Sequence, residues 1–276
     1  MAKTGSDSQP GTAEGAALGR ALHSRHAQDP VLDDSWAIHL LSPENRELVL
    51  ASRDEAAMQM LEGFDASPIF AVNVGCLRYA EDEVERCIAS GISQYLVLGA
   101  GLDSFALRRA DLSQEVAVFE VDHPDMQALK RQRIAEAAQE PAMLPAFIAV
   151  DFECDKLAEK ISCSDFDSSK PAVVSWLNTV HYLSEDATSA TLQELAQLLA
   201  PGSRLILNYS VDVALTEPQL AFITQLFKVT QATGEPFKSR WTPAAFETLL
   251  NSNGFSVIEH ATEDDLGRRY FDSRSD

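Results

Sequence analysis

The sequence predicts an α/β fold: a doubly wound, mostly parallel sheet with helices on both faces and a helical cap at the N-terminal end. Three observations lead to this prediction. From about residue 93, short apolar runs alternate with segments of helical pattern. A glycine turn follows the first of these runs, and the first quarter of the chain is helical in pattern throughout. Alternating strands and helices are typical of α/β proteins with a parallel sheet.

The expected strands are the apolar runs, which read YLVLG, VAVFEVD, AFIAVD, AVVSWL and RLILNYS. Helices fit between them over residues 125–139 and 185–200. A later helix over 242–254, with Pro243 in its first turn, leads to one more expected strand, 255–260. Parallel strands of this kind are buried on both faces, and right-handed crossovers place ligands at their carboxyl ends.

The N-terminal part predicts helices over residues 12–26, 29–41, 44–64 and 77–90, with Asp29-Pro30 and Ser42-Pro43 as two of the helix starts. Residues 1–11 are rich in Gly, Ser and Pro and predict a flexible tail. We therefore expect a tail over 1–11, a helical N-terminal cap over 12–92 and a catalytic domain over 93–276.

Charge and hydropathy narrow the class of protein. The formal net charge is −20, which disfavours nucleic acid as a partner because phosphate backbones are repelled. No apolar run approaches the roughly 20 residues of a membrane helix, and the polar N-terminus lacks the apolar segment of a secretory signal. These features predict a cytoplasmic protein with no membrane partner.

Neither cysteines nor histidines predict a metal site. The four cysteines form no CxxC pair and are expected as reduced thiols. His23 and His26 have a spacing that suits a metal but lack convincing further ligands, so we expect no metal. The basic run KRQR, residues 130–133, is expected on a solvated helix face.

The glycine turn predicts a nucleotide-type cofactor. Gly99 and Gly101 come directly after the first strand, where glycine lets a ligand approach the backbone closely. Asp103 lies where the next helix begins and is a candidate N-cap. A dinucleotide fingerprint requires a third glycine at position 104, but Ser104 stands there.

Acids follow the second and third strands. Asp122 ends the second strand, with Glu120 on the same face of it. An acid in this position accepts both hydroxyls of an adenosine ribose, in NAD and S-adenosylmethionine alike. Asp151 follows the third strand and is suited to the adenine amino group, with Phe152 near the base; its alternative role is a helix N-cap.

The segments QYLVLGAGLDSFALR, VFEVDHP, VDFECD and SWLNTVHYL together resemble the leucine carboxyl methyltransferase family. This family includes a bacterial branch of S-adenosylmethionine-dependent O-methyltransferases, among them polyketide carboxyl methyltransferases. The likeness extends to TAEGAALGRALHS, DPVLDD and RRYFDSR, so it covers most of the chain.

This resemblance implies a class I methyltransferase (Rossmann-like) fold with S-adenosyl-L-methionine as cofactor. The implied contacts are the methionine moiety with Gly99, Ala100 and Gly101, the ribose with Asp122, the adenine with Asp151 and Phe152, and the cofactor carboxylate with Arg78. An arginine suits that last role because its guanidinium binds a carboxylate in bidentate fashion. Without the resemblance, Arg78 would be interpreted as a surface ion-pair residue.

The chain departs from the family pattern at two places. Eukaryotic members carry a glutamate after the fourth strand, where this chain has Leu177 and Asn178, so that contact is not transferred. The closing residues RRYFDSRSD leave little room for the usual last strand, which leaves the edge of the sheet open.

The expected reaction is methyl transfer to an oxygen, with a methyl ester on a small-molecule carboxylate as the leading hypothesis. The candidate catalytic residues are His181, Asn178 and Tyr182, in the segment after the fourth strand, with Trp176 beside them. His181 suits a general base, with a structural histidine as the alternative. Arg269 and Tyr270 are candidates to fold over the pocket or to form an ordinary polar tail.

Three alternatives remain open at this stage. One is methylation of a hydroxyl or phenol, with His181 as base. Another is a methyltransferase-like protein that binds the cofactor without catalysis. A nicotinamide oxidoreductase is disfavoured by Ser104 and by the Asp-Phe pair after the third strand. Neither the acceptor nor the oligomeric state follows from the sequence.

Overall fold

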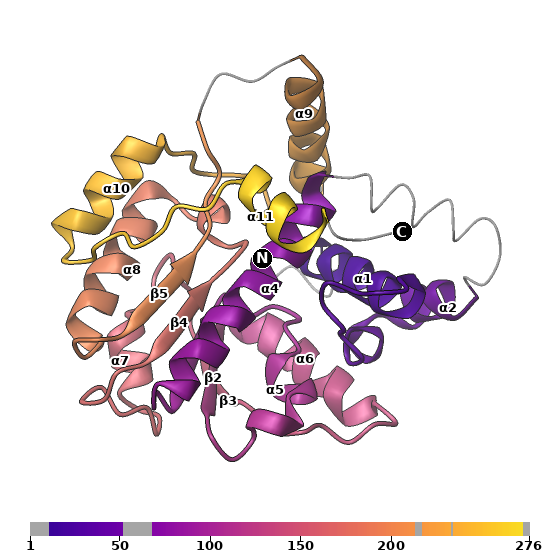
Figure 1. Cartoon of the computed structure of the whole chain (residues 1–276), viewed down its shortest axis with the longest axis horizontal. Coiled ribbons are helices and arrows are strands. Elements are labelled where there is room, and N and C mark those ends of the chain that lie inside the picture. The colour runs from indigo at the N-terminus through magenta and orange to yellow at the C-terminus, as the bar shows by residue number, and fades with distance from the viewer. Residues whose placement is uncertain (1–10, 52–67, 213–216, 233, 273–276) are drawn as a thin grey trace, which may run out of the picture.

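The computed structural model describes residues 11–51, 68–212, 217–232 and 234–272, and it contains a five-stranded parallel sheet between two layers of helices (Figure 1). The strand order is β3-β2-β1-β4-β5. The strands are β1 (Gln94–Leu98), β2 (Ala117–Asp122), β3 (Ala146–Ala149), β4 (Val173–Trp176) and β5 (Arg204–Leu207). Every neighbouring pair is parallel, so the predicted doubly wound α/β fold is confirmed.

Helices connect the strands in the expected alternation. The helices of the sheet region are α5 (Phe105–Arg108), α6 (Pro124–Glu136), α7 (Leu157–Ile161), α8 (Glu185–Leu198), α9 (Glu217–Ala232), α10 (Pro243–Ser252) and α11 (Glu263–Tyr270). Three short 3-10 turns are η1 (Ala37–Leu40), η2 (Ala110–Leu112) and η3 (Val180–Tyr182). The chain enters α6 and α10 at Pro124 and Pro243, which are favoured in a first helical turn.

Two apolar layers cover the sheet because successive strand residues point to opposite faces. Leu96, Leu98 and Phe119 face α7, α8 and α10 in one core. Tyr95 and Val97 face α4 and α5 in the other. Both faces of the central strands are therefore buried, as their continuous apolar runs predict.

The N-terminal helices are α1 (Gly11–His26), α2 (Pro43–Ala51) and α4 (Pro68–Ala89). α1, α2 and η1 share a third apolar cluster with Leu102 and Leu107 of the sheet region. The predicted tail over 1–11 lies outside the described residues, except for Gly11, which begins α1. Residues 52–64 of the predicted third helix also lie outside the described residues. The C-terminal half of α4 packs on the sheet, although it belongs to the predicted cap. The division into a cap over 12–92 and a catalytic domain over 93–276 therefore stays a prediction.

Two expected elements are wrong. Residues 29–41 form no continuous helix; only Ala37–Leu40 make a 3-10 turn. Here Asp34 Oδ1 accepts the N–H groups of Trp36 and Ala37, and such local side-chain bonds compete with helix formation. The expected strand 255–260 is irregular and unpaired with β5; Val257 and Ile258 are 41% and 73% exposed, so no burial favours a ladder there.

The basic run 130–133 is only in part the solvated face that its composition predicts: Arg131 and Gln132 are exposed, but the other two residues are buried. Lys130 and Arg133 are 1% and 7% exposed. Lys130 pairs with Glu120 of β2, and Arg133 pairs with Glu14 of α1, each at 2.5 Å. α6 is therefore fixed between the sheet and the N-terminal helices by two buried ion pairs.

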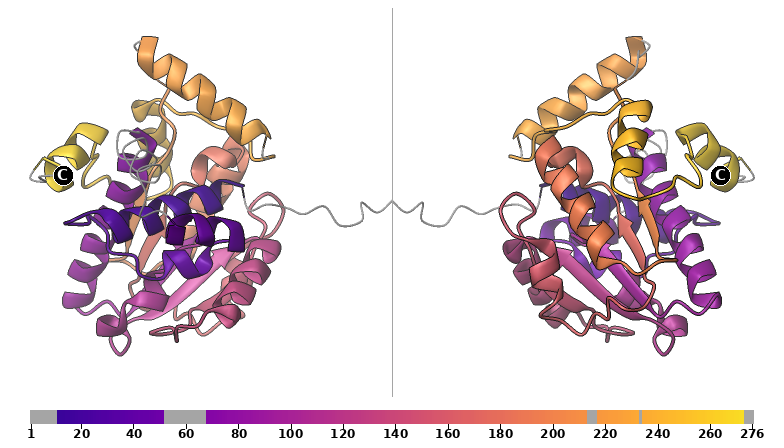
Figure 2. Two further views of the ribbon diagram at one scale, coloured as in Figure 1. Left: turned by 90° about the vertical axis from the view of Figure 1, so that its right-hand side faces the viewer. Right: turned by 90° about the vertical axis from the view of Figure 1, so that its left-hand side faces the viewer.

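Two helices extend the molecule beyond the expected elements. α9 projects from the layered body in both side views (Figure 2). α11 packs against α4, where Leu266 and Phe271 lie over Gly75. Within the described ranges, none of the helices combines the length and the apolar character needed to cross a membrane.

Candidate active site

The glycine turn after β1 forms the centre of the site. Gly99 and Gly101 have φ angles of 63° and 49°, which residues with side chains rarely adopt. The N–H groups of Gly99 and Ala100 donate to the carbonyl of Val121, at 2.8 and 3.2 Å. A Cβ atom on Gly99 would lie 2.1 Å from Thr179 Oγ1. Position 99 therefore needs glycine both for its backbone angle and for the close approach of the segment after β4.

Asp122 lies beside this turn at the end of β2 and is half-buried. Its Oδ2 accepts the N–H of Gly101 at 2.5 Å, and its Oδ1 accepts the N–H of His123 at 2.6 Å. Burial raises the pKa of Asp122 above its ordinary value, although these two N–H groups favour the ionised form. Each carboxylate oxygen has further acceptor capacity, so Asp122 is able to bind two hydroxyl groups.

Glu120, the other acid of β2, has a different environment. It is 1% exposed, and Oε2 binds Lys130 Nζ at 2.5 Å. Burial raises the pKa of Glu120, and Lys130 opposes that rise. Asp122 is therefore the acid of β2 that remains available to a ligand.

Asp151 and Phe152 come directly after β3 and its flanking residue Val150. Asp151 Oδ1 accepts the N–H of Glu153 at 3.0 Å, and this bond holds the pKa of Asp151 below its ordinary value. Phe152 stacks on Trp176, with ring centroids 6.2 Å apart. Trp176 is fully buried, so it supports Phe152 from below and does not reach the edge where a substrate would bind.

The register places these residues on one edge of the sheet. Leu98 of β1 pairs with Val121 of β2 and with Trp176 of β4. Asp122 pairs with Ala149 of β3. The structure thus brings the glycine turn, Asp122 and the segments after β3 and β4 together, as the carboxyl ends of parallel strands require.

Arg78 is held by acids of its own helix. Its guanidinium binds Asp82 at 2.5 Å and Glu85 at 3.1 Å, with Glu81 at 3.8 Å. Arg109 shares Glu81 and Glu85 from the side of η2. A contact between Arg78 and a cofactor carboxylate stays a prediction, and it requires an exchange of these partners.

Asn178 links the loop after β4 to two neighbouring elements. It has a positive φ of 54°. Its side-chain Nδ2 donates to Asn73 of α4 at 2.7 Å. Its side-chain Oδ1 accepts from Nδ2 of Asn208, just after β5, at 2.8 Å. Both polar groups of the Asn178 side chain are used in these hydrogen bonds, which fix the backbone beside Thr179 and the glycine turn.

His181 and Tyr182 belong to an aromatic cluster. The His181 ring lies 4.3 Å from the rings of both Tyr182 and Phe237, and Phe227 of α9 lies 5.1 Å from Phe237. Burial lowers the pKa of His181 to about 4. Burial also raises the pKa of Tyr182 to about 12. At neutral pH the imidazole is therefore uncharged and the phenol is protonated.

Helix α1 covers this region, where the sequence predicts a helical cap beside the ligand crevice; its individual contacts were not predicted. Ala13 would lie 3.5 Å from a Cβ atom on Gly101. The hydroxyl of Thr12 donates to Glu235 at 2.8 Å, and the Thr12 side chain also bonds to Tyr182. The start of α1 thus lies between the glycine turn and the aromatic cluster. The small residues of TAEGAALG are the only sequence signal for such close packing.

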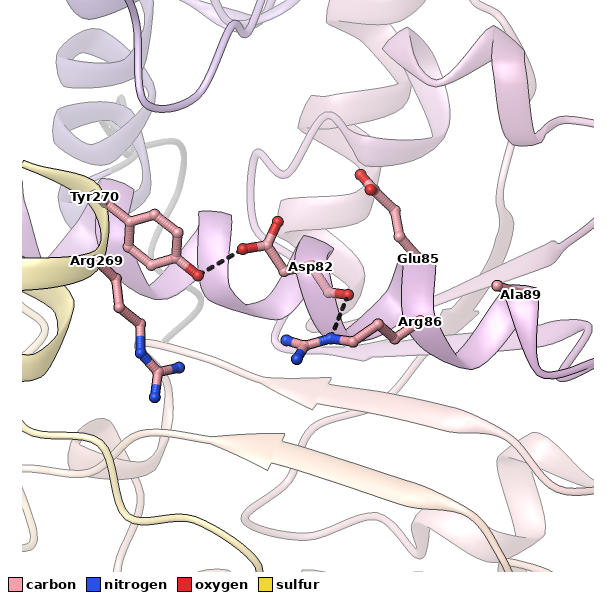
Figure 3. A pocket seen from close by; sticks show the side chains of 6 residues that line it. All are labelled: Asp82, Glu85, Arg86, Ala89, Arg269 and Tyr270. Carbon is pink, nitrogen blue, oxygen red and sulfur yellow. Dashed lines mark hydrogen bonds between the residues drawn. The ribbon is translucent and has the colours of Figure 1, made fainter. Parts of the chain in front are cut away.

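The C-terminal residues line a pocket on the outer side of α4 (Figure 3). Tyr270 donates to Asp82 at 2.6 Å, and Arg269 pairs with Glu259. Asp82, Glu85, Arg86 and Ala89 of α4 form the rest of the lining. Tyr270 is therefore close to the Arg78 partner Asp82, and neither Arg269 nor Tyr270 has a contact with the glycine turn in this structure.

Metal-binding geometry is absent from the part of the chain that the structure describes: it holds no group of three or more His, Cys, Asp or Glu side chains suited to an ion. His23 is fully buried and its Nε2 accepts the N–H of Val31 at 2.9 Å. This bond gives His23 a structural role in the N-terminal cap.

Comparisons with known proteins agree with this geometry. Residues 13–196 match the family model described as leucine carboxyl methyltransferase. The Bacillus subtilis protein named "Putative S-adenosyl-L-methionine-dependent methyltransferase YktD" is 27% identical over 95% of this chain and 91% of its own length. A protein of the same kind from Mycobacterium tuberculosis, Rv0830, is 30% identical over 74% of this chain and 67% of its own length.

Solved structures support the fold. A protein described as a methyltransferase from Thermobifida fusca superposes with a TM-score of 0.56 and 21% identity, over 94% of this chain and 90% of that one. A DUF574 family protein from Streptomyces avermitilis gives a TM-score of 0.54 and 17% identity, over 86% and 81%.

The match of the family model spans two thirds of the sequence and includes the glycine turn, Asp122, Asp151 and the segment after β4. The chain therefore belongs to the leucine carboxyl methyltransferase family, and it is an S-adenosyl-L-methionine-dependent methyltransferase.

Proposed function

We propose that the chain is an O-methyltransferase that forms a methyl ester on a carboxylate of a small molecule. The uncharged, ring-enclosed His181 carries this proposal. A carboxylic acid has a pKa of about 4 and is already ionised at neutral pH, whereas a phenol, at about 10, needs a base. A histidine with a pKa of about 4 is a poor base, and among the described residues no acid bonds to its ring.

The residues of the glycine-turn edge fit the cofactor. When bound, S-adenosyl-L-methionine supplies an activated methyl group on a sulfonium. The turn of Gly99 and Gly101 is assigned to the methionine moiety because it lies at the carboxyl edge of the sheet and within the residues that match the family model. The two oxygens of Asp122 suit the ribose hydroxyls. Asp151 and Phe152 are suited to the adenine.

The residues after β4 would position the acceptor. In-line displacement depends on orientation and on exclusion of water more than on deprotonation of a carboxylate. Asn178 fixes the loop through Asn73 and Asn208. The hydroxyl of Tyr182 bonds to Thr12 in this structure, and it would donate to a carboxylate oxygen on exchanging that partner. The His181 and Phe237 rings exclude water. In this proposal Asn178 acts by positioning and His181 as an apolar wall.

The acceptor is a small molecule in this proposal, and the location is cytoplasmic. The net charge of −20 disfavours nucleic acid. Cys76, Cys87, Cys154 and Cys163 are all free thiols in the structure, which suits a reducing compartment.

The test is a panel of carboxylic acids and matched phenols, incubated with methyl-labelled S-adenosyl-L-methionine. We expect label transfer to an acid and release of labelled methanol in mild alkali. His181→Gln should then lose less than about tenfold in rate, because no proton transfer is removed. An alkali-stable product together with a loss above about a hundredfold would contradict the ester and identify a hydroxyl O-methyltransferase with His181 as its base.

A further inference from the structure

A buried ion pair joins the N-terminal cap to the glycine turn. Arg20 of α1 is 5% exposed and Asp34 is 1% exposed. Arg20 Nε binds Asp34 Oδ2 at 2.8 Å, and Arg20 Nη2 donates to the carbonyl of Leu102 at 2.6 Å. Leu102 directly follows Gly101. One guanidinium therefore bonds both to the cap and to the backbone of the cofactor turn.

The neighbours of Asp34 hold it in its ionised state. Burial alone would raise the pKa of Asp34, but Arg20 and Arg108 hold it below its ordinary value, and the Ser104 hydroxyl also bonds to it. Arg108 Nε lies 3.9 Å from Asp34 Oδ1, and the same guanidinium pairs with Glu81 of α4. The charges of this cluster are compensated, so both bonds of Arg20 are made without an unpaired buried charge.

The turn is consequently fixed from two directions. On the sheet side, the N–H of Gly101 donates to Asp122. On the cap side, the carbonyl of Leu102 accepts from Arg20, and a Cβ atom on Gly101 would meet Ala13 in ordinary van der Waals contact, at 3.5 Å. The N–H of Gly101 and the carbonyl of Leu102 are thus held by Asp122 and by Arg20.

We propose that Arg20 and Asp34 are a positioning pair, which holds the glycine turn in the orientation that receives the cofactor. This inference rests on the assignment of the turn to S-adenosyl-L-methionine. Arg20 does not touch the cofactor; it acts through the carbonyl of Leu102. Lysine is not equivalent here, because a single ammonium group lacks the planar fork that reaches two partners in fixed directions.

The test compares Arg20→Lys with Arg46→Lys. Arg46 also binds carbonyls within the cap, those of Ile38, His39 and Leu41, but none in the glycine turn. Both variants should lower the melting temperature. In calorimetric titrations with S-adenosylhomocysteine, well below every melting temperature, only Arg20→Lys should weaken binding, by about fivefold or more. Equal dissociation constants for wild type and Arg20→Lys would overturn the positioning role.

The wild type separates the two proposals. If the wild-type chain does not bind S-adenosylhomocysteine, the assignment of the turn to the cofactor fails. If the wild-type chain binds, the dissociation constants of the variants decide whether Arg20 and Asp34 are a positioning pair. Hydrogen exchange of the Gly101 amide without ligand gives an independent readout. It should be faster in Arg20→Lys than in Arg46→Lys, and equal protection would also overturn the proposal.

Should Arg20→Lys fail to fold, Asp34→Asn replaces it. The amide keeps an acceptor oxygen for the N–H groups of Trp36 and Ala37, but it loses the charge that orients Arg20. We expect the same direction of change in both readouts. An unchanged dissociation constant together with unchanged Gly101 exchange would contradict the pair.

Discussion

The two sides of the carboxyl edge are held by different kinds of contact. The glycine-turn side, residues 99–103 with Asp122, rests on buried charges: Arg20 with Asp34, and Lys130 with Glu120 beneath it. The aromatic side, formed by His181, Tyr182, Phe227 and Phe237, rests on ring contacts of 4.3 to 5.2 Å.

This difference matches what each side has to do. Ion pairs and bidentate hydrogen bonds are directional and fix a backbone in one orientation, which suits a cofactor that is the same in every turnover. Contacts between apolar and aromatic rings tolerate repacking more readily than buried ion pairs do. A side of that kind is suited to acceptors of differing shape, and it excludes water around a nucleophile that needs no base.

The largest effect on stability is expected from the buried ion pair of Lys130 and Glu120, beneath the glycine-turn side. Lys130→Met leaves Glu120 buried without its partner and should lower the free energy of unfolding by about 3 kcal/mol or more. The double variant Lys130→Met/Glu120→Leu should regain most of that loss, because replacing both charges by apolar groups removes the desolvation cost. Urea denaturation measures both.

The control is Lys160→Met. Its partner is Asp155, in an ion pair of 3.4 Å at the surface, and such pairs contribute little. If Lys160→Met were as destabilising as Lys130→Met, buried charge would not distinguish the glycine-turn side.

The next effect concerns the point where the two sides meet. Gly99→Ala combines a strained φ with a collision against Thr179 and should cost about 2 kcal/mol or more. Gly91 also has a positive φ, of 97°, but nothing lies within 4 Å of an added Cβ atom, so Gly91→Ala reports backbone strain alone. Thr179→Ala in the Gly99→Ala background should restore part of the stability. Equal losses for Gly91→Ala and Gly99→Ala would show that the close approach to Thr179 has no energetic weight.

The smallest effect concerns the aromatic side and its response to acid. The pKa of His181 is about 4 in the folded chain, against an ordinary value of 6.5. Between these values the unfolded chain binds more protons, so stability falls as the pH falls. His181→Gln should make the decline of the unfolding free energy between pH 6.5 and 4 shallower. A decline as steep as in the wild type would mean that His181 does not resist protonation.

The sequence predicts the sheet and its helices well, because their signals are local. Alternation of apolar runs with helices identified all five strands, and the order of Gly99, Asp122 and Asp151 indicated where their side chains would meet. The expected helix over 29–41 was wrong because the side chain of Asp34 bonds to its own neighbours. The expected strand over 255–260 was wrong because Val257 and Ile258 remain exposed.

What the sequence could not predict depends on distant partners. Lys130 and Arg133 look like a solvated helix face, yet Arg133 meets Glu14, which lies 119 residues away. Arg20 meets Leu102 across 82 residues. The acid partners of Arg78 lie within one helix, but no pattern indicates which of them would bind it.

The most direct test of this account is calorimetric titration of S-adenosylhomocysteine into the wild-type chain and three variants. Asp122→Ala should weaken binding at least tenfold, because charge-assisted hydrogen bonds contribute about 1.5–3 kcal/mol each. Asp125→Asn, a change at an exposed acid three residues further along the chain, and His181→Gln should stay within about threefold of the wild type, less than one hydrogen bond. Absence of binding in the wild type, or equal losses for Asp122→Ala and His181→Gln, would contradict the division of the edge into a cofactor side and an acceptor side.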